Sequence, residues 1–273
     1  IINENTKLNV VYVLDDDERL NAAISQLNKS LGTVITYQVG SQTQVLDASI
    51  FQPWISVNRN LEVVLDEDAV SENVKELAST YNTYHSTKKL MTSYGVEISI
   101  YNSHYGWKVD NQAEKEAIIA DILSGEQITR DLNYSATANS RDGNDFGDSY
   151  VEINLAAQHL FLYVDGELVL ESDFVSGNIS KSYYTPTGAY GITYKEKGAT
   201  LNGEDYSTPV DYWMPFAGNV GMHDATWRDS FGGDIYLNNG SHGCVNLPWS
   251  SAKTIFGYVD AGFPVLVYEL YGT

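Results

Sequence analysis

Glycine is distributed unevenly along this chain of 273 residues, and the unevenness limits the folds open to it. Six glycines precede residue 146 and sixteen follow it. Glycine is unfavourable inside helices and common in tight turns. The glycine-poor first part can therefore hold regular helices, whereas the second part is expected to be short strands joined by turns. We predict two domains of different class, for which 273 residues are sufficient.

Three segments of the first part carry apolar residues at helical spacing. One runs from Asp15 to Leu31 and begins with acidic residues. A second is expected to be capped by Asp68. A third runs from Asn111 to Ser124, between a capping Asp110 and a terminating Gly125. These segments predict three helices.

The same spacing predicts which residues of these helices are buried. They are Val70, Val74, Leu77, Tyr81 and Tyr84 in the second helix and Ala117, Ile118 and Leu123 in the third. Three further runs have the composition of strands: Thr33 to Val39, Leu61 to Leu65 and Val96 to Tyr101. We therefore predict an α+β accessory domain over residues 1–140.

The second part contains short β-like runs separated by turns. The runs expected to be strands are Tyr150 to Leu155, His159 to Val164, Glu167 to Phe174 and Phe263 to Tyr268. Asp165-Gly166 separates two of them, and this dipeptide favours a hairpin. Only Ser250 to Tyr258 has a helical pattern, and Asn133 to Asp148 has the composition of a linker. We predict a mostly β domain over residues 148–273, with a curved or sandwiched sheet.

The charge of the chain limits its partners. Acidic residues outnumber basic ones by 36 to 16, which gives a formal charge of −20. Such a chain is repelled by phosphate backbones, so we expect no nucleic-acid partner. The longest apolar runs are Val10 to Leu14, Leu160 to Val164 and Val265 to Tyr268. All are far shorter than the ~20 residues of a membrane helix, so we expect no membrane span in this segment.

Cys244 is the only cysteine, so the chain can form no intramolecular disulfide. It lies in Gly240 to Asn246, downstream of Met222-His223-Asp224. A cysteine nucleophile reacts as the thiolate, which a nearby imidazole commonly stabilises. Gly243 would let the N–H groups of Gly243 and Cys244 turn toward a developing oxyanion. These residue types together indicate cysteine acyl transfer.

Two other interpretations of Cys244 are open. A lone cysteine is more often a small buried hydrophobe, although core cysteines usually lie in apolar runs and this one is flanked by His, Gly and Ser. A zinc site built from His223, His242 and Cys244 would need Asp224 or water as its fourth ligand. His242 and Cys244 are only two positions apart, and no other cysteine exists. We therefore predict no metal and no cofactor.

His223, seventeen intervening residues and then Ser241 to Asn246 resemble the active-site motif of the peptidoglycan L,D-transpeptidases, with their YkuD-type catalytic domain. The resemblance covers about residues 148–270. It also includes Gln158 to Leu160, Thr185 to Gly188, Met214 to Phe216 and Phe231 to Gly233. In the first domain, Tyr105 to Asp110 followed by a helix resembles the peptidoglycan-binding modules that precede such catalytic domains. The two-domain arrangement is most like the enzymes of Gram-positive cocci.

The resemblance implies roles for five residues. Cys244 would be the nucleophile and His223 its base, attacking the third, L-configured residue of a tetrapeptide stem and releasing D-alanine. An amine of a neighbouring stem would then resolve the thioester into a 3→3 cross-link. Backbone N–H groups of residues 242–244, including Gly243, would hold the oxyanion. Ser241 is expected to orient His223 through its carbonyl. His242 is an acid/base, an oxyanion donor or a structural residue.

The resemblance also implies partners and location. The donors would be tetrapeptide stems, the acceptors amine-bearing stems, and carbapenem-type β-lactams covalent inhibitors. We expect an extracytoplasmic protein at the cell wall, anchored in the membrane through a segment upstream of Ile1. Two alternatives are an L,D-carboxypeptidase, which passes the same thioester to water, and a non-catalytic cell-wall-binding protein.

Overall fold

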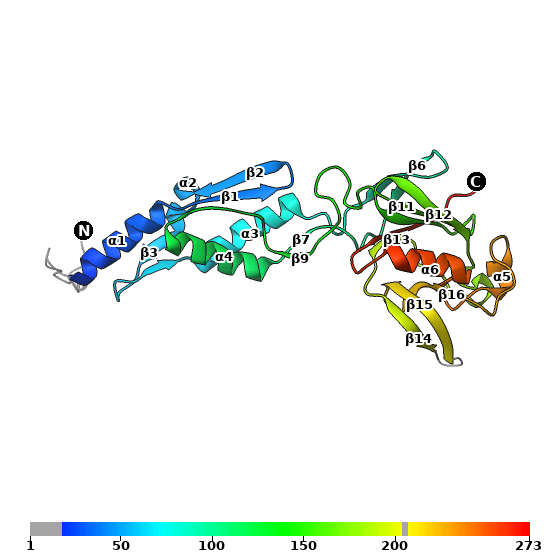
Figure 1. The fold of residues 1–273 in the computed structure, drawn as a ribbon. Helices are drawn as coiled ribbons and strands as arrows, with labels where there is room; N and C mark the ends of the chain where they lie inside the picture. The colour runs from blue at the N-terminus through cyan, green and yellow to red at the C-terminus, as the bar shows by residue number, and fades with distance from the viewer. Residues whose placement is uncertain (1–17, 204–206) are drawn as a thin grey trace, which may run out of the picture. The chain divides into compact units, whose positions relative to one another are not determined.

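The computed structural model describes residues 18–203 and 207–273. The chain divides into two compact units (Figure 1). The first unit comprises residues 1–80 and 110–133, and the second comprises residues 81–109 and 134–273. This division differs from the predicted boundary at residue 140, because residues 81–109 belong to the second unit.

The first unit combines helices with small sheets. Its elements are α1 (Glu18–Leu31), β1 (Val34–Val39), β2 (Gln42–Asp47), α2 (Ala48–Phe51), η1 (Gln52–Trp54), β3 (Ile55–Val57), β4 (Val63–Leu65), α3 (Glu67–Tyr81), α4 (Asn111–Ser124) and β8 (Gln127–Arg130). One sheet has the order β2-β1-β8, with β1 antiparallel to β2 and parallel to β8. β3 and β4 form a separate antiparallel pair. The predicted α+β class is confirmed.

Helix α4 begins and ends where the sequence predicts. Asp110 accepts hydrogen bonds from the N–H groups of Gln112 and Ala113, and Gly125 ends the helix with φ of 72°. A glycine suits this left-handed conformation, which costs other residues free energy.

The buried face of α4 contains a charge that the apolar pattern does not reveal. Glu114 is fully buried beside Ile118 and Ile122, whereas Ala117 and Leu123 are only partly buried.

Three residues hold the Glu114 carboxylate in place. It accepts hydrogen bonds from Arg130 at 2.7 and 2.9 Å, from the Tyr37 hydroxyl at 2.9 Å and from the Asn133 N–H at 2.8 Å. Burial raises the pKa of Glu114, but these hydrogen bonds and the Arg130 charge outweigh burial and lower it.

Helix α3 begins two residues earlier than expected. Asp66 accepts hydrogen bonds from the N–H groups of Asp68 and Ala69, so the expectation that Asp68 caps this helix is wrong. The predicted inner face is buried as far as Tyr81, where the helix ends. Tyr84 lies beyond it. At the start of α1, Asp15 to Asp17 lie outside the described residues.

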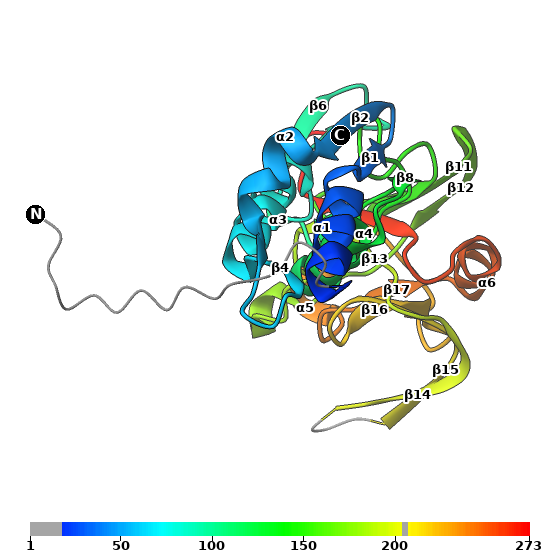
Figure 2. The ribbon, with the colours of Figure 1, turned by 90° about the vertical axis from the view of Figure 1, so that its left-hand side faces the viewer.

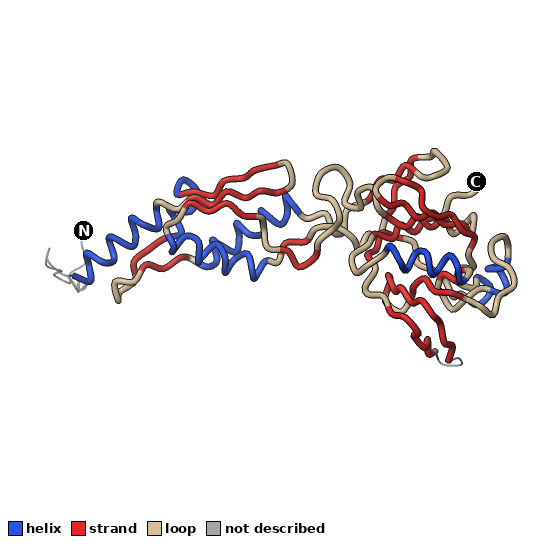
Figure 3. Tube along the Cα trace, viewed as in Figure 1, coloured by secondary structure: helices blue, strands red, loops and turns tan. Residues whose placement is uncertain are grey.

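The second unit is mostly β, as predicted (Figure 3). Its strands are β5 (Lys88–Met91), β6 (Glu97–Ile100), β7 (Lys108–Val109), β9 (Tyr134–Ala136), β10 (Tyr150–Asn154), β11 (His159–Val164), β12 (Glu167–Asp173), β13 (Gly188–Gly191), β14 (Glu196–Asn202), β15 (Ser207–Ala217), β16 (Val220–Asp224), β17 (Val245–Leu247) and β18 (Pro264–Tyr268). Its helices are η2 (Ile179–Lys181), α5 (Ile235–Asn239) and α6 (Trp249–Tyr258).

Two sheets of this unit share one core. The orders are β12-β11-β10-β18-β13 and β14-β15-β16-β17. Buried side chains of both sheets, such as Ile153 and Leu162 from one and Met214 and Met222 from the other, belong to a single apolar cluster that α6 also joins through Ile255. This is the predicted sandwiched arrangement. Figure 2 shows the β14–β15 hairpin extending away from β16 and β17.

The local predictions in the second unit hold with one exception. Asp165 and Gly166 both have positive φ, 51° and 82°, as a two-residue hairpin turn requires. Helix α6 occupies the predicted segment, but α5 is a second helix that the sequence analysis did not expect. Five residues are too few to show a helical period. Within residues 18–203 and 207–273, no helix is long and apolar enough to cross a membrane.

The segment predicted as a linker is largely built into the second unit. Residues 134–136 form β9, which pairs with β7. Phe146 is buried in a cluster with Leu90, Ile100 and Tyr105. A composition rich in Ser, Asn, Gly and Asp does not reveal that strand pairing and one buried aromatic side chain hold this segment in the second unit.

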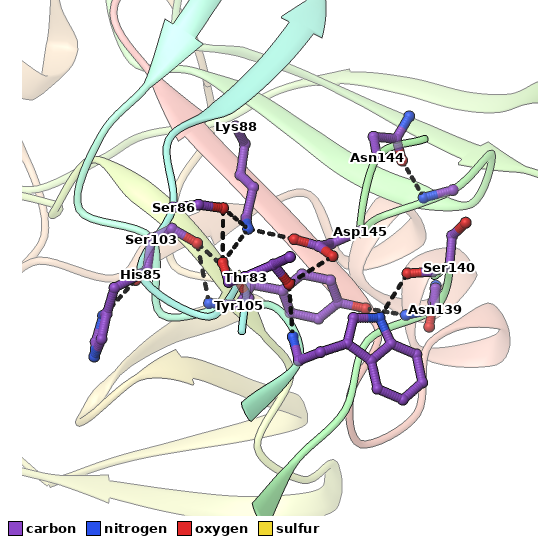
Figure 4. A network of polar contacts seen from close by, with 12 residues as sticks. Thr83, His85, Ser86, Lys88, Ser103, Tyr105, Asn139, Ser140, Asn144 and Asp145 are labelled. Carbon is purple, nitrogen blue, oxygen red and sulfur yellow. Dashed lines mark hydrogen bonds and ion pairs between the residues drawn. The ribbon is translucent and has the colours of Figure 1, made fainter. Parts of the chain in front are cut away.

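A buried ion pair ties this segment to residues 83–107 (Figure 4). Lys88 is 4% exposed and donates to the Asp145 carboxylate, the Thr83 carbonyl and the Ser86 hydroxyl. The Thr83 hydroxyl donates to the other Asp145 oxygen at 2.8 Å and accepts the N–H of Trp107 at 2.9 Å. These bonds are one reason that residues 81–109 belong to the second unit.

We predict that Lys88→Met lowers the free energy of unfolding of the second unit by about 3–5 kcal/mol, because it leaves the Asp145 carboxylate buried without its counter-charge. Lys89→Met is the matched control, since the Lys89 side chain is 74% exposed. Its effect should stay within about 0.5 kcal/mol. Urea unfolding followed by tryptophan fluorescence measures both variants. Equal, small effects would show that the ion pair does not hold this unit together.

Candidate active site

Two neighbouring strands position the predicted site residues. β16 runs parallel to β17, with His223 opposite Asn246, and Cys244 immediately precedes β17. The side chains of Cys244, His223, His242 and Ser241 line one pocket of about 210 Å³. The structure therefore brings together residues that the sequence separates into two segments.

A backbone carbonyl orients the His223 ring. The ring Nδ1 lies 2.9 Å from the carbonyl oxygen of Asp224. A carbonyl can only accept, so Nδ1 carries the proton, and in the neutral ring Nε2 keeps a lone pair for accepting another. The expected orienting carbonyl, that of Ser241, instead accepts the N–H of Asn178 at 2.9 Å. That expectation is wrong.

His223 is kept neutral by its surroundings. Its side chain is 4% exposed, and the rings of Trp213 and Trp227 lie 5.9 and 6.0 Å from it. Burial lowers the pKa of His223, and the nearby Arg228 charge lowers it further, against the hydrogen bond and charge of Asp224. At neutral pH the ring is therefore able to take up a proton.

The side chain of Asp224 serves the neighbouring strand. It is 2% exposed, and Oδ1 accepts the N–H groups of Asp211 and Tyr212 at 2.9 and 2.8 Å. Adjacent residues of a strand point to opposite faces, so the Asp224 side chain is not expected to be the group that orients the His223 ring. The contacts agree, and they place the acid in the fold as a structural group.

Cys244 is a protonated thiol in these surroundings. Its Sγ lies 3.7 Å from the Asn219 carbonyl oxygen, to which the thiol donates. Burial raises its pKa to about 11, although a hydrogen bond from the Gly221 N–H opposes the rise. The sequence suggested a thiolate stabilised by imidazole. The structure instead presents a neutral thiol and a neutral imidazole, so the proton must move when the sulfur attacks.

Ser241 fixes the loop that carries the cysteine. Its hydroxyl donates to the Cys244 carbonyl oxygen at 2.5 Å and accepts the Gly243 N–H at 3.0 Å. The Gly243 N–H is therefore already engaged and is not directed at an oxyanion, contrary to expectation.

Thr185 supports the same loop from another segment, and sequence reasoning missed it. Its hydroxyl accepts the Gly177 N–H at 3.0 Å and donates to the Gly243 carbonyl oxygen at 2.7 Å. The segment Thr185 to Gly188 enters the sequence analysis only through the family resemblance, and its partner Gly243 lies 58 residues further along the chain. Gly243 has φ of 120°, and a Cβ there would lie 3.3 Å from the Val220 side chain. The positive φ favours glycine at this position, and a larger residue would also displace the Val220 side chain.

His242 lies at the outer edge of the pocket. It is exposed, unlike His223, and its ring lies 4.6 Å from that of Tyr183. Among the described residues there is no group of three His, Cys, Asp or Glu side chains arranged to hold a metal ion.

A second pocket, which the sequence did not predict, also reaches Cys244. Its volume is about 420 Å³, and Tyr194, Glu196, Trp213 and Asn219 contribute to its walls. The sulfur-bearing residue therefore lies where two pockets meet.

We predict that Cys244 shows no thiolate absorbance at neutral pH. A raised pKa keeps the thiol protonated until strongly alkaline pH, so the thiolate fraction should rise toward a midpoint of about 11. Ultraviolet titration of the thiolate measures this directly, because Cys244 is the only thiol. Cys244→Ser supplies the tyrosine background to be subtracted. A constant thiolate signal from neutral pH upward would contradict the assignment.

Two family models match the chain. Residues 148–267 match the YkuD model, described as the L,D-transpeptidase catalytic domain. Residues 16–130 match the model described as "Putative peptidoglycan binding domain". The resemblance stated from the sequence is confirmed in both parts.

Solved structures and a curated protein agree with these matches. The Ldtfm-avibactam carbamoyl enzyme is 34% identical over 92% of this chain and 100% of its own, with a TM-score of 0.71. A cysteine-to-serine mutant of the Enterococcus faecium L,D-transpeptidase is 34% identical over 90% and 99%, with a TM-score of 0.70. "Probable L,D-transpeptidase 3" of Mycobacterium tuberculosis is 31% identical over 98 residues, which are 32% of this chain and 35% of that protein. The match thus spans about a third of this curated relative.

Proposed function

This chain belongs to the L,D-transpeptidase family, and from that premise we propose that Cys244 and His223 transfer an acyl group between peptidoglycan stems. The donor is a tetrapeptide stem, which is cut after its third, L-configured residue. The acceptor is a side-chain amine of a neighbouring stem. The product is a 3→3 cross-link, and D-alanine is released.

The site supports a stepwise proton transfer. Nε2 of His223 takes the proton of the Cys244 thiol as Sγ bonds to the donor carbonyl carbon. The tetrahedral intermediate collapses when the C–N bond breaks, and the imidazolium returns its proton to the departing D-alanine amine. The acceptor amine then attacks the thioester, gives its proton to His223, and the C–S bond breaks to restore the thiol. The observation that carries this proposal is the hydrogen bond from Nδ1 to the Asp224 carbonyl, which leaves Nε2 as the acceptor.

The oxyanion of the intermediate needs a backbone donor. Because the Gly243 N–H is held by Ser241, our candidate is the N–H of Cys244 itself, with Gly243 and Ser241 fixing its direction. His242 contributes at the pocket edge, where it is available to contact the stem peptide.

The two pockets favour transpeptidation over hydrolysis. Cys244 lines both the 210 Å³ pocket that contains His223 and the 420 Å³ pocket that contains Glu196. A carboxypeptidase needs only a donor site and water. A second pocket at the same sulfur offers an acceptor stem its own approach.

The domain matches place the protein at the cell wall, since both describe modules directed at peptidoglycan or its synthesis. We propose that the first unit binds peptidoglycan near the cross-linking site. Membrane anchoring through a segment upstream of Ile1 stays a prediction.

We further propose that carbapenem-type β-lactams acylate Cys244. A solved relative, matched over 100% of its own length, is an avibactam carbamoyl enzyme, so an enzyme with this fold accepts a covalent acyl-type inhibitor, although avibactam itself is a cyclic urea.

The test is mass spectrometry of purified disaccharide-tetrapeptide incubated with enzyme. Wild type should yield a dimer that lacks one D-alanine, and Cys244→Ala should yield none. His223→Gln should slow turnover by about 10²–10⁴-fold, as expected when a general base is removed. His85→Gln is the matched control, because His85 is an exposed histidine of the same unit.

Other outcomes would redirect or overturn the assignment. Monomers that only lose D-alanine would indicate a carboxypeptidase. Dimers from Cys244→Ala would exclude the thiol as nucleophile. No conversion by wild type, together with retained wall binding by Cys244→Ala, would leave the non-catalytic alternative.

A further inference from the structure

Arg228 places a positive charge in the wall of the pocket that holds Cys244 and His223. It follows β16 by four residues and is partly buried. Its Nη1 donates to the Asn239 carbonyl at 2.8 Å, whereas its Nε is buried and has no hydrogen-bond partner among the described residues. Within the same residues no carboxylate forms an ion pair with it.

This arrangement is unfavourable for the folded protein alone. A partly buried cation without a counter-charge costs free energy, and its desolvation lowers the pKa of Arg228. The chain carries a formal charge of −20, so acidic partners are plentiful elsewhere. The described residues contain three buried side-chain atoms without hydrogen-bond partners, and two of these, Arg228 Nε and Asn246 Oδ1, belong to residues that line this pocket. The pocket therefore offers unused polar groups to a ligand.

The reaction proposed above identifies the matching anion, and the inference rests on that proposed function. The nitrogen that His223 must protonate belongs to the terminal D-alanine, whose carboxylate is one carbon away. A carboxylate there must lie close to His223. Arg228 and His223 line the same pocket, so the guanidinium lies on the side of the site where this carboxylate must be. The second pocket instead carries Glu196, which would repel a carboxylate.

We propose that Arg228 binds the terminal carboxylate of the donor stem and thereby selects stems that end at the fourth residue. A guanidinium suits this task because it stays charged and can donate two parallel hydrogen bonds to a carboxylate. In a longer stem the carboxylate lies one residue further from the scissile bond, out of register with Arg228. Arg228 thereby determines which stem serves as the donor, and it positions the departing D-alanine beside His223.

The test compares two donors that differ only at the terminus: the tetrapeptide with a free carboxylate and the same peptide as its C-terminal carboxamide. For wild type, kcat/KM should be at least about tenfold higher for the carboxylate, the range expected of a charge-assisted hydrogen bond. Arg228→Gln should lose this preference by slowing the carboxylate donor alone. Arg228→Lys should keep part of it. Lys253→Gln, which removes an exposed cation of the same unit, should keep all of it.

The ratio of kcat/KM for the two donors distinguishes the ways in which the inference can fail. If Arg228→Gln slows both donors equally, Arg228 only supports the loop through Asn239 and the inference is wrong. The inference also fails if the preference survives in Arg228→Gln. If wild type converts neither donor, the proposed function itself fails. Because both donors meet the same His223, a change in its pKa cancels in the ratio.

Discussion

The parallel pairing of β16 with β17 is the constraint on which the candidate site depends. It sets His223 opposite Asn246 and leaves Cys244 at the entry to β17, so two distant segments deliver base and thiol to one pocket. Side chains of both strands, including Met222 and Val245, are buried in the core shared by the two sheets. A shift of one residue in this register would turn these side chains to the opposite face. The register that buries these apolar side chains is therefore the same register that places His223 and Cys244 in one pocket.

Burial then determines the protonation states of Cys244 and His223 before substrate binds. It raises the pKa of Cys244 and lowers that of His223, so both groups rest uncharged. The loop between the strands is held by neutral hydrogen bonds from Ser241 and Thr185. Arg228 is the one charged side chain in the pocket wall, and it lies where the donor's leaving group would carry its own charge. An uncharged thiol is a weaker nucleophile than a thiolate, so the sulfur depends on proton transfer to His223 when it attacks.

Part of the fold and of the candidate site could be predicted from the sequence, and the predictions that failed share a physical cause. Periodicity and composition located four of the six described α-helices but only seven of the eighteen described strands. The spacing of His223 and Ser241 to Asn246 identified the family. These successes rest on local signals. The wrong or missing predictions concern hydrogen-bond partners that are close together only in the folded chain. The sequence could not show that Ser241 holds Gly243 instead of His223, or that Thr185 reaches the same loop. Nor could it show that burial would protonate the thiol, since desolvation depends on what packs around a side chain.

The central claim is that His223 rests as a neutral ring with its proton on Nδ1, ready to accept at Nε2. Nitrogen-15 NMR of the His223 side chain measures this most directly, because the shifts of the two ring nitrogens distinguish both tautomers and the imidazolium. The account predicts the Nδ1–H tautomer at neutral pH, remaining neutral as the pH falls below the usual histidine pKa of about 6.5. An imidazolium at neutral pH, or a proton on Nε2, would contradict it.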